Sequence, residues 1–333
     1  MIDQLQSQAL ALWEKIHPQM VKPPRLSYLL QSRDHILIFW FEQGNKSDQP
    51  VLISKIPRTK SFNAPLEQSL DLLNRLRPSL TPPLVNTIPV RVFAGKVNEL
   101  SHVVMTAMPG EPIMIPGNNR LGRRTVLEHL SAFQDWLTEF QSQTYLDNQV
   151  YDFPGWQEIF ARQRRETFSA IPQAGQFQQI SGTISRRLAN RPIPCTWGYG
   201  DAHHSNILLQ NGKVSGIIDW VGVQQSQWFF IDWYYFIFFY ALEFFKKNQA
   251  VDRQIQLRMA ISTTMGIKEH WLADIFQEKT RQFLAVYAFD PDLNPDFLLA
   301  FLQQLYWPRE KARLIQEAFA IYNQRPSRSE QES

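Results

Sequence analysis

The amino-acid sequence predicts an α+β fold in two lobes, with a small antiparallel sheet in the N-terminal lobe and a larger, helical C-terminal lobe. Behind a short leading helix, the chain has five strand-like apolar segments and one helical run before residue 110. After that point most apolar residues recur at helical spacing. A sheet and a set of helices that are segregated along the chain are typical of α+β proteins. We place the lobes at residues 1–108 and 109–333, since 333 residues can form two cores.

Composition excludes several classes of protein. Hydrophobic residues make up 44% and charged residues 20% of the chain, as in ordinary globular domains. The net charge of +3 is too small to indicate nucleic-acid or membrane binding. The single cysteine, Cys195, excludes an internal disulfide and a cysteine metal cluster. Because a reducing compartment suits such a chain and the N-terminus has no secretory pattern, we expect a cytoplasmic protein.

The elements of the N-terminal lobe follow from apolar patterning and from proline. Leu5, Leu12 and Ile16 share one face of the leading helix, which Pro18 ends. Apolar runs bounded by polar or proline-rich segments predict strands. These strands lie at residues 25–30, 35–41, 50–58, 88–93 and 102–108, and a helical run lies at residues 66–73.

The C-terminal lobe is predicted from longer helical runs. The strongest, over residues 123–143, has one continuous apolar face. Weaker helices are predicted over residues 155–170 and 176–189. The aromatic run 228–245 contains two acidic residues, so we interpret it as a buried helix rather than a membrane span. Further helices are predicted within residues 255–305.

Three polar residues of the C-terminal lobe have spacings that together indicate chemistry. Asn206 follows Asp201 by five residues, and Asp219 follows Asn206 by thirteen. Between the last two, an Asn-Gly pair at 211–212 separates two apolar runs and predicts a tight β-hairpin, which returns Asp219 to the vicinity of Asn206. Kinase-type phosphotransferases use one such Asp to orient a hydroxyl, and an Asn and a second Asp to bind Mg²⁺.

Segments 197–206 and 218–220 resemble the aminoglycoside phosphotransferase and choline kinase family. The catalytic loop of that family reads His-Gly-Asp-x-x-x-x-Asn and is followed by Ile-Asp-Trp. The resemblance implies a protein-kinase-like fold. It also implies that Asp201 is the catalytic residue and that Asn206 and Asp219 are the magnesium ligands.

The same resemblance assigns a nucleotide to the N-terminal lobe. Lys55, the single charge in an apolar strand, would bind the phosphates of ATP or GTP, and Glu67, twelve residues later in a helix, would steady it. The backbone of Thr106, Ala107 and Met108 would bond the edge of the base. Taken without the resemblance, Lys55 and Glu67 are an ordinary strand-end lysine and a surface glutamate, and the last segment is only a turn.

The chain departs from the family pattern at two places. Tyr199 replaces the first His of the catalytic motif, and residues 226–228 read Ser-Gln-Trp where the family has Gly-Asp-Pro. The turn at residues 31–34 also lacks the glycines of the protein-kinase phosphate loop, although the resembled family often has only a short loop there. The two histidines at 203–204 raise the alternative of a metal centre, but no cysteine or second histidine pair lies at ligand spacing nearby.

These observations predict a small-molecule kinase that moves the γ-phosphate of ATP or GTP to a hydroxyl of a sugar, an amino alcohol or a similar metabolite, with Mg²⁺ as cofactor. Residues 110–333 contain 22 basic and 23 acidic residues, a balance that disfavours a polycationic acceptor. We expect no nucleic-acid partner and no integral membrane segment. The departures leave one alternative open, a kinase-like module that binds nucleotide but is catalytically impaired.

Overall fold

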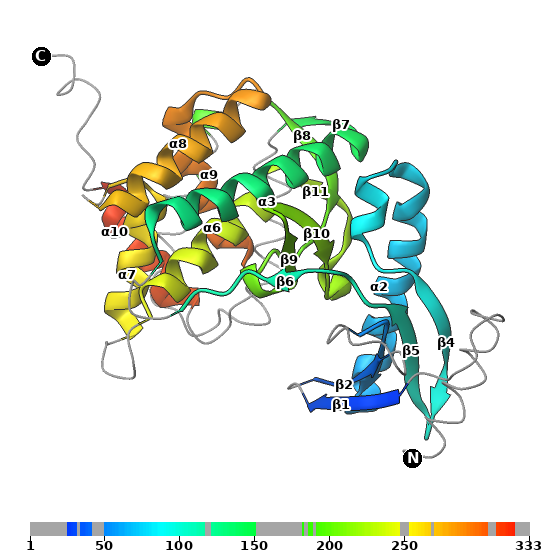
Figure 1. Ribbon diagram of the computed structural model, residues 1–333. Helices are drawn as coiled ribbons and strands as arrows, with labels where there is room; N and C mark the ends of the chain where they lie inside the picture. Colours follow the sequence, from blue (N-terminus) through cyan, green and yellow to red (C-terminus); the bar gives the residue numbers. More distant parts are fainter. Residues whose placement is uncertain are drawn as a thin grey trace, which may run out of the picture. The chain divides into compact units, whose positions relative to one another are not determined.

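The computed structural model describes residues 25–31, 34–41, 50–116, 121–150, 182, 186–188, 191–246, 253–267, 270–305 and 311–323. The predicted leading helix and the predicted helix over residues 155–170 lie outside the described residues, as does most of the one predicted over residues 176–189. The described residues form an α+β fold, as predicted (Figure 1).

The chain forms two compact units. The first comprises Met1–Ile113, Tyr199–Asp201 and Ser205–Gln225, and the second comprises Met114–Gly198, Ala202–His204 and Ser226–Ser333. The first unit differs from the predicted N-terminal lobe because it also holds the segment with Asp201, Asn206 and Asp219. The chain returns to this unit because strand β6 (Glu111–Pro112) pairs with strand β9 (Ile207–Gln210).

The main sheet of the first unit is antiparallel throughout, in the strand order β1-β2-β3-β5-β4 (Figure 1). Its strands are β1 (Arg25–Gln31), β2 (His35–Phe41), β3 (Leu52–Pro57), β4 (Arg91–Val97) and β5 (Leu100–Thr106). The last two differ from their predicted positions, residues 88–93 and 102–108. A 3-10 helix over Leu84–Thr87 delays the start of β4, and a tight turn at Asn98 and Glu99, both at positive φ, fixes where β4 ends and β5 begins.

The two faces of this sheet have different roles. One face is a closed apolar core, formed by Ile38, Trp40, Leu52, Ile56, Val97 and Val104. The register places Leu37 opposite Lys55 and Lys55 opposite Val103, so these side chains share the other face. Helix α2 (Asn63–Leu76) covers part of it, because its apolar residues Leu66 and Leu70 pack on Val103.

A second, three-stranded sheet completes the first unit, in the order β10-β9-β6. Strands β9 and β10 (Lys213–Ile217) form the predicted hairpin. Its turn residues Asn211 and Gly212 have φ of 53° and 73°, the conformation for which an Asn-Gly pair is preferred. The hairpin therefore follows from its local sequence.

The second unit is mainly helical. Its helices are α3 (Arg123–Gln143), α6 (Phe230–Phe244), α7 (Arg253–Thr264), α8 (Trp271–Val286), α9 (Asn294–Gln304) and α10 (Lys311–Asn323) (Figure 1). The aromatic run forms α6, whose Trp233, Tyr234 and Phe236 have no exposed surface. A sheet in the order β11-β8-β7, from β7 (Tyr145–Val150), β8 (Pro192–Gly198) and β11 (Gln224–Trp228), was not predicted. Among the described residues, no helix is both long and apolar enough to span a bilayer.

Candidate active site

The β9–β10 hairpin brings Asn206 and Asp219 to the same end of a short ribbon. Ile207 pairs with Ile217, the first and last residues of the hairpin strands. Just beyond this pair, the backbone N–H of Ile218 donates to the carbonyl of Asn206 at 2.9 Å. The two residues predicted to bind metal therefore flank one hydrogen-bonded end of the hairpin.

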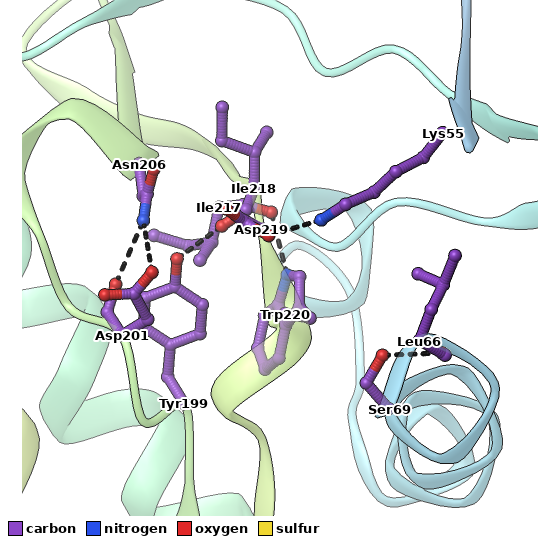
Figure 2. A network of polar contacts seen from close by, with 10 residues as sticks. All are labelled: Lys55, Leu66, Ser69, Tyr199, Asp201, Asn206, Ile217, Ile218, Asp219 and Trp220. Carbon is purple, nitrogen blue, oxygen red and sulfur yellow. Dashed lines mark hydrogen bonds and ion pairs between the residues drawn. The ribbon is translucent and has the colours of Figure 1, made fainter. Parts of the chain in front are cut away.

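Asn206 also contacts Asp201 directly. Its Nδ2 donates to the Asp201 carboxylate Oδ2 at 3.0 Å and to the Asp201 backbone carbonyl at 3.2 Å (Figure 2). Because the nitrogen of this side-chain amide is engaged in hydrogen bonds, its oxygen is the atom left to coordinate a cation. The structure thus brings together all three members of the sequence motif, with Asn206 between the two aspartates.

Tyr199, which replaces the family histidine, is completely buried beneath this arrangement. Its hydroxyl donates to the carbonyl of Ile218, the residue before Asp219, and its ring meets the ring of Trp220 edge-on at 4.9 Å. Trp220 in turn donates from Nε1 to the carbonyl of Ile217 at 2.8 Å. Tyrosine therefore supplies a hydrogen-bond donor that positions the backbone around Asp219.

The segments that carry Asp201 and Asp219 approach each other backbone to backbone. Gly200 has a φ of +82°, and a Cβ on it would lie 1.9 Å from the carbonyl oxygen of Gly222, in the 3-10 helix η5 (Trp220–Gly222). Only glycine fits both this conformation and this distance. Gly200 therefore fixes how closely the two segments pack.

Substituting Gly200→Ala is expected to lower the free energy of unfolding by more than about 2 kcal/mol, since it adds backbone strain and a collision with Gly222. The matched control is Gly212→Ala in the hairpin turn, where φ is +73° but no atom lies within 4 Å of the added Cβ. Denaturant unfolding of both variants separates strain from close approach. Equal losses would contradict the importance of the Gly200–Gly222 contact.

Lys55 forms an ion pair with Asp219. Its Nζ lies 2.6 Å from Asp219 Oδ1, and the lysine side chain is 7% exposed while the aspartate is 44% exposed (Figure 2). Asp219 itself has left-handed backbone angles, φ 60° and ψ 59°, which are uncommon for a non-glycine residue. A nearly buried cation thus faces a partly open carboxylate, as a site for a metal–phosphate ligand requires.

The predicted partner of Lys55, Glu67, does not contact it. Glu67 is exposed, and its Oε1 accepts a hydrogen bond from Ser101 Oγ at 2.6 Å. The buried stripe of α2 passes through Leu66, Ser69 and Leu70, so Glu67 lies beside the stripe and reaches β5 instead. The polar residue on the stripe is Ser69, whose Oγ donates to the carbonyl of Leu66 at 2.8 Å. The expectation that Glu67 steadies Lys55 is therefore wrong.

Glu67→Gln is expected to leave nucleotide affinity unchanged and to lower the free energy of unfolding by about 1 kcal/mol, because it weakens one side-chain hydrogen bond to β5. Isothermal titration with nucleotide and denaturant unfolding measure the two effects. Gln68→Ala, at the next exposed position of the helix, serves as the control. A tenfold loss of nucleotide affinity in the glutamate variant alone would restore the original assignment.

The segment assigned to the base has two of its three amide donors already bonded. Thr106 N–H donates to the carbonyl of Val90 at 2.9 Å, and Ala107 N–H donates to the carbonyl of Val51 at 3.0 Å. Within the described part of the chain, no bond occupies the N–H of Met108. The N–H groups of Thr106 and Ala107 are thus engaged within the protein, whereas the N–H of Met108 can meet a ligand, and the assignment of this segment to the base stays a prediction.

Sequence reasoning missed the apolar surface beside this segment. The register places Phe39 opposite Ile53 and Ile53 opposite Met105, and Leu37 lies on the same face opposite Lys55. All four apolar side chains are half-buried. The alternating side chains of the strands at residues 35–41 and 50–58 were the available signal in the sequence. Which of them share a face of the sheet could be assigned only once the pairing register was known. Such a surface suits one side of a flat heterocyclic ring.

The histidines at 203–204 belong to the second unit and pack against α6. His204 is buried with its ring 6.3 Å from that of Tyr240, and half-buried His203 lies 5.7 Å from Phe239. Among the described residues, no group of three or more His, Cys, Asp or Glu is placed to hold a metal. A kinase-type Mg²⁺ site needs no such group, since one or two protein ligands suffice.

Comparison with known proteins identifies the family. A family model described as the phosphotransferase enzyme family matches residues 38–226, more than half of the chain. The chain belongs to this family. The matched span contains Lys55, Asp201, Asn206 and Asp219.

Solved structures of phosphotransferases share the fold. The macrolide 2'-phosphotransferase MphH from Brachybacterium faecium is 11% identical, with 96% of this chain and 100% of that chain covered and a TM-score of 0.51. A thermostable mutant of aminoglycoside phosphotransferase APH(4)-Ia, solved with AMP-PNP and hygromycin B, is 10% identical, with 93% of this chain and 97% of that chain covered and a TM-score of 0.55. Amicoumacin kinase hAmiN, solved with AMP-PNP, Ca²⁺ and Ami, is 14% identical, with 98% and 97% covered and a TM-score of 0.50. No curated protein sequence matches. The family member described here thus has the predicted protein-kinase-like α+β fold.

Proposed function

We propose that this protein transfers the γ-phosphate of ATP, or of GTP, to a hydroxyl group of a small molecule. The observation that carries the proposal is the position of Asn206. Its side-chain amide donates to Asp201, while its backbone carbonyl accepts from Ile218, the residue before Asp219. Asn206 thus connects the segment of the proposed catalytic carboxylate, Asp201, to the segment of the proposed metal ligand, Asp219, through two hydrogen bonds.

Asn206 and Asp219 are the proposed ligands of Mg²⁺. The donor set fits, since Mg²⁺ prefers oxygen and usually takes one or two protein ligands while phosphates and water supply the rest. Asp219 offers a partly exposed carboxylate, and Asn206 offers an amide oxygen. When bound, the ion neutralises charge on the nucleotide phosphates.

The protein's own groups account for the remaining steps. Asp201, oriented by Asn206 Nδ2, holds the acceptor hydroxyl and takes its proton as the hydroxyl oxygen bonds to the γ-phosphorus. The bond between the γ-phosphorus and the β–γ bridging oxygen breaks, and the nucleoside diphosphate leaves with the bonding electrons. Lys55 lies beside Asp219 and would offset the phosphate charge. The N–H of Met108 and the apolar face around Ile53 would hold the base.

The acceptor class is constrained by charge. Residues 110–333 are balanced at 22 basic and 23 acidic residues, whereas a polycationic acceptor calls for an excess of acidic groups. A neutral or singly charged hydroxyl compound, such as a sugar or an amino alcohol, fits this balance better. The solved relatives include enzymes named for macrolide and aminoglycoside phosphorylation, and their names describe those proteins only.

The competing function is a nucleotide-binding module that has lost transfer. The glycine-free turn at residues 31–34 is the observation that favours it. Tyr199 counts less in its favour than the sequence indicated, because its hydroxyl supports the Asp219 segment. Retention of Lys55, Asp201, Asn206 and Asp219 in one compact unit favours transfer.

The test combines binding with turnover. Thermal unfolding is recorded with ATP or GTP, each with and without Mg²⁺, and nucleoside diphosphate release is then measured against a panel of hydroxyl compounds. A nucleotide- and Mg²⁺-dependent rise in Tm, together with acceptor-dependent release, is the expected result. A rise in Tm without release on any acceptor favours the binding module. No nucleotide-dependent rise at all rejects the proposal.

A further inference from the structure

His35 is the first residue of strand β2, in the main sheet that also carries Lys55. The four residues before it in the sequence, 31–34, contain no glycine. Glycine-rich turns bind phosphate because their backbone N–H groups can approach it closely. Residues 31–34 offer no glycine for this purpose, so a side chain next to them is an alternative source of a phosphate donor.

The strand register places the His35 side chain on the face that carries Lys55. His35 lies opposite Pro57 and Leu37 lies opposite Lys55, and alternate residues of a strand point to the same side. His35 is therefore one step along the sheet from the lysine, toward the turn. The opposite face, with the core around Ile38, is closed.

The surroundings hold the imidazole in place and keep it neutral. The ring packs 6.1 Å from the ring of Phe62, in the 3-10 helix η1 (Lys60–Phe62), and the residue is only 9% exposed. Burial and the positive charge of Lys55 lower the pKa of His35 to about 4, although Asp219 and Asp34 act in the opposite direction. A neutral imidazole has one N–H donor and one acceptor nitrogen. The ring shares a sheet face with Lys55, whose Nζ pairs with Asp219.

We propose that His35 is a phosphate-positioning residue, whose ring N–H donates a hydrogen bond to a phosphate oxygen of the bound nucleotide. The proposal rests on the proposed function, since it needs a nucleotide held by Lys55 and Asp219. A hydrogen bond from a neutral imidazole would orient the phosphate oxygen, while Lys55 supplies the positive charge. Phe62 and the strand hold the ring in one orientation, so little freedom is lost when the phosphate binds.

The test compares ligands that differ in phosphate number. His35→Leu removes the donor at similar volume, and His35→Asn retains an N–H donor. We expect the leucine variant to bind ATP and ADP with Mg²⁺ about tenfold more weakly, the value of one hydrogen bond of about 1.4 kcal/mol, and to bind adenosine like the wild type. We expect the asparagine variant to recover most of the affinity for ATP. Isothermal titration measures all three ligands.

The matched control is His129→Leu. His129 is a half-buried histidine of α3 whose Nδ1 lies 2.9 Å from the Tyr240 hydroxyl, in the second unit. It should leave all three affinities unchanged. An equal loss for adenosine and ATP in the His35 variant would overturn the proposal in favour of a role in the sheet, and unchanged ATP affinity would also overturn it. If the wild type binds no nucleotide, the proposed function itself fails, which the wild-type titration shows first.

Discussion

Replacing Asp201 with asparagine is expected to reduce turnover by about 10³-fold, because it removes the group that takes the proton of the acceptor hydroxyl. Nucleotide affinity should stay within about twofold, since the proposed phosphate and base contacts are on Lys55, Asp219 and the N-terminal sheet rather than on Asp201. The asparagine oxygen can still accept from Asn206, whose Nδ2 lies 3.0 Å from the present carboxylate. The variant should therefore keep the local geometry and lose only the base.

Three measurements define this result: turnover of the best acceptor, nucleotide affinity with Mg²⁺, and Tm. Asp71→Asn is the matched control, because Asp71 lies in the same unit and, among the residues that the structure describes, its carboxylate pairs only with Arg91 at the surface, at 3.4 Å. It should leave all three unchanged. If Asp201→Asn loses nucleotide binding as strongly as turnover, the aspartate is structural and the assignment of the base is wrong.

The hairpin that assembles the site could be predicted because its determinants are local. Asn211 and Gly212 select a turn with positive φ at both positions, and the turn sets the register of the two strands. The register then places residues before the first strand and after the second strand together. The meeting of Asn206 with the Asp219 segment follows from about a dozen residues of sequence, with no information from the rest of the chain.

The partner of Lys55 could not be predicted because it depends on how a helix is rotated against a sheet. Successive helical residues are about 100° apart, so Glu67 points well away from Leu66 and from the buried stripe. Twelve residues of separation place Glu67 on the right element but give no information about its direction. The amides of Thr106 and Ala107 present the same difficulty, because their acceptors, Val90 and Val51, are set by pairing between distant strands.

The backbone of Asp219 is a further feature that sequence cannot reveal. Its left-handed φ of 60° would be unremarkable for glycine but is strained for an aspartate. Two hydrogen bonds fix the backbone that leads into it: the Tyr199 hydroxyl donates to the carbonyl of Ile218, and Trp220 Nε1 donates to the carbonyl of Ile217. The conformation turns the carboxylate toward Lys55 on β3, so one strained residue connects the hairpin to the sheet.

Lys55→Met is expected to lower kcat/KM by about 10²-fold, because it removes a nearly buried cation beside the phosphates. The same substitution should have the opposite effect on metal binding without nucleotide. In the present structure Lys55 Nζ is 2.6 Å from Asp219 Oδ1, so the lysine and a divalent cation compete for one carboxylate. Without the lysine, Asp219 should bind Mg²⁺ more tightly in the nucleotide-free protein, while ATP binds more weakly.

Titration with Mg²⁺ alone and with nucleotide in the presence of Mg²⁺ measures the two opposed effects, and Lys60→Met provides the control. Lys60 belongs to the same unit but pairs with Glu99 at the surface, where both side chains are mostly exposed, so its loss should change neither affinity. If the Lys55 variant binds Mg²⁺ more tightly and ATP more weakly than the wild type, the Lys55–Asp219 ion pair opens when the metal–nucleotide complex binds. If Mg²⁺ and ATP affinities fall together, Lys55 instead maintains the position of Asp219, and the two residues act as one structural unit rather than as competitors.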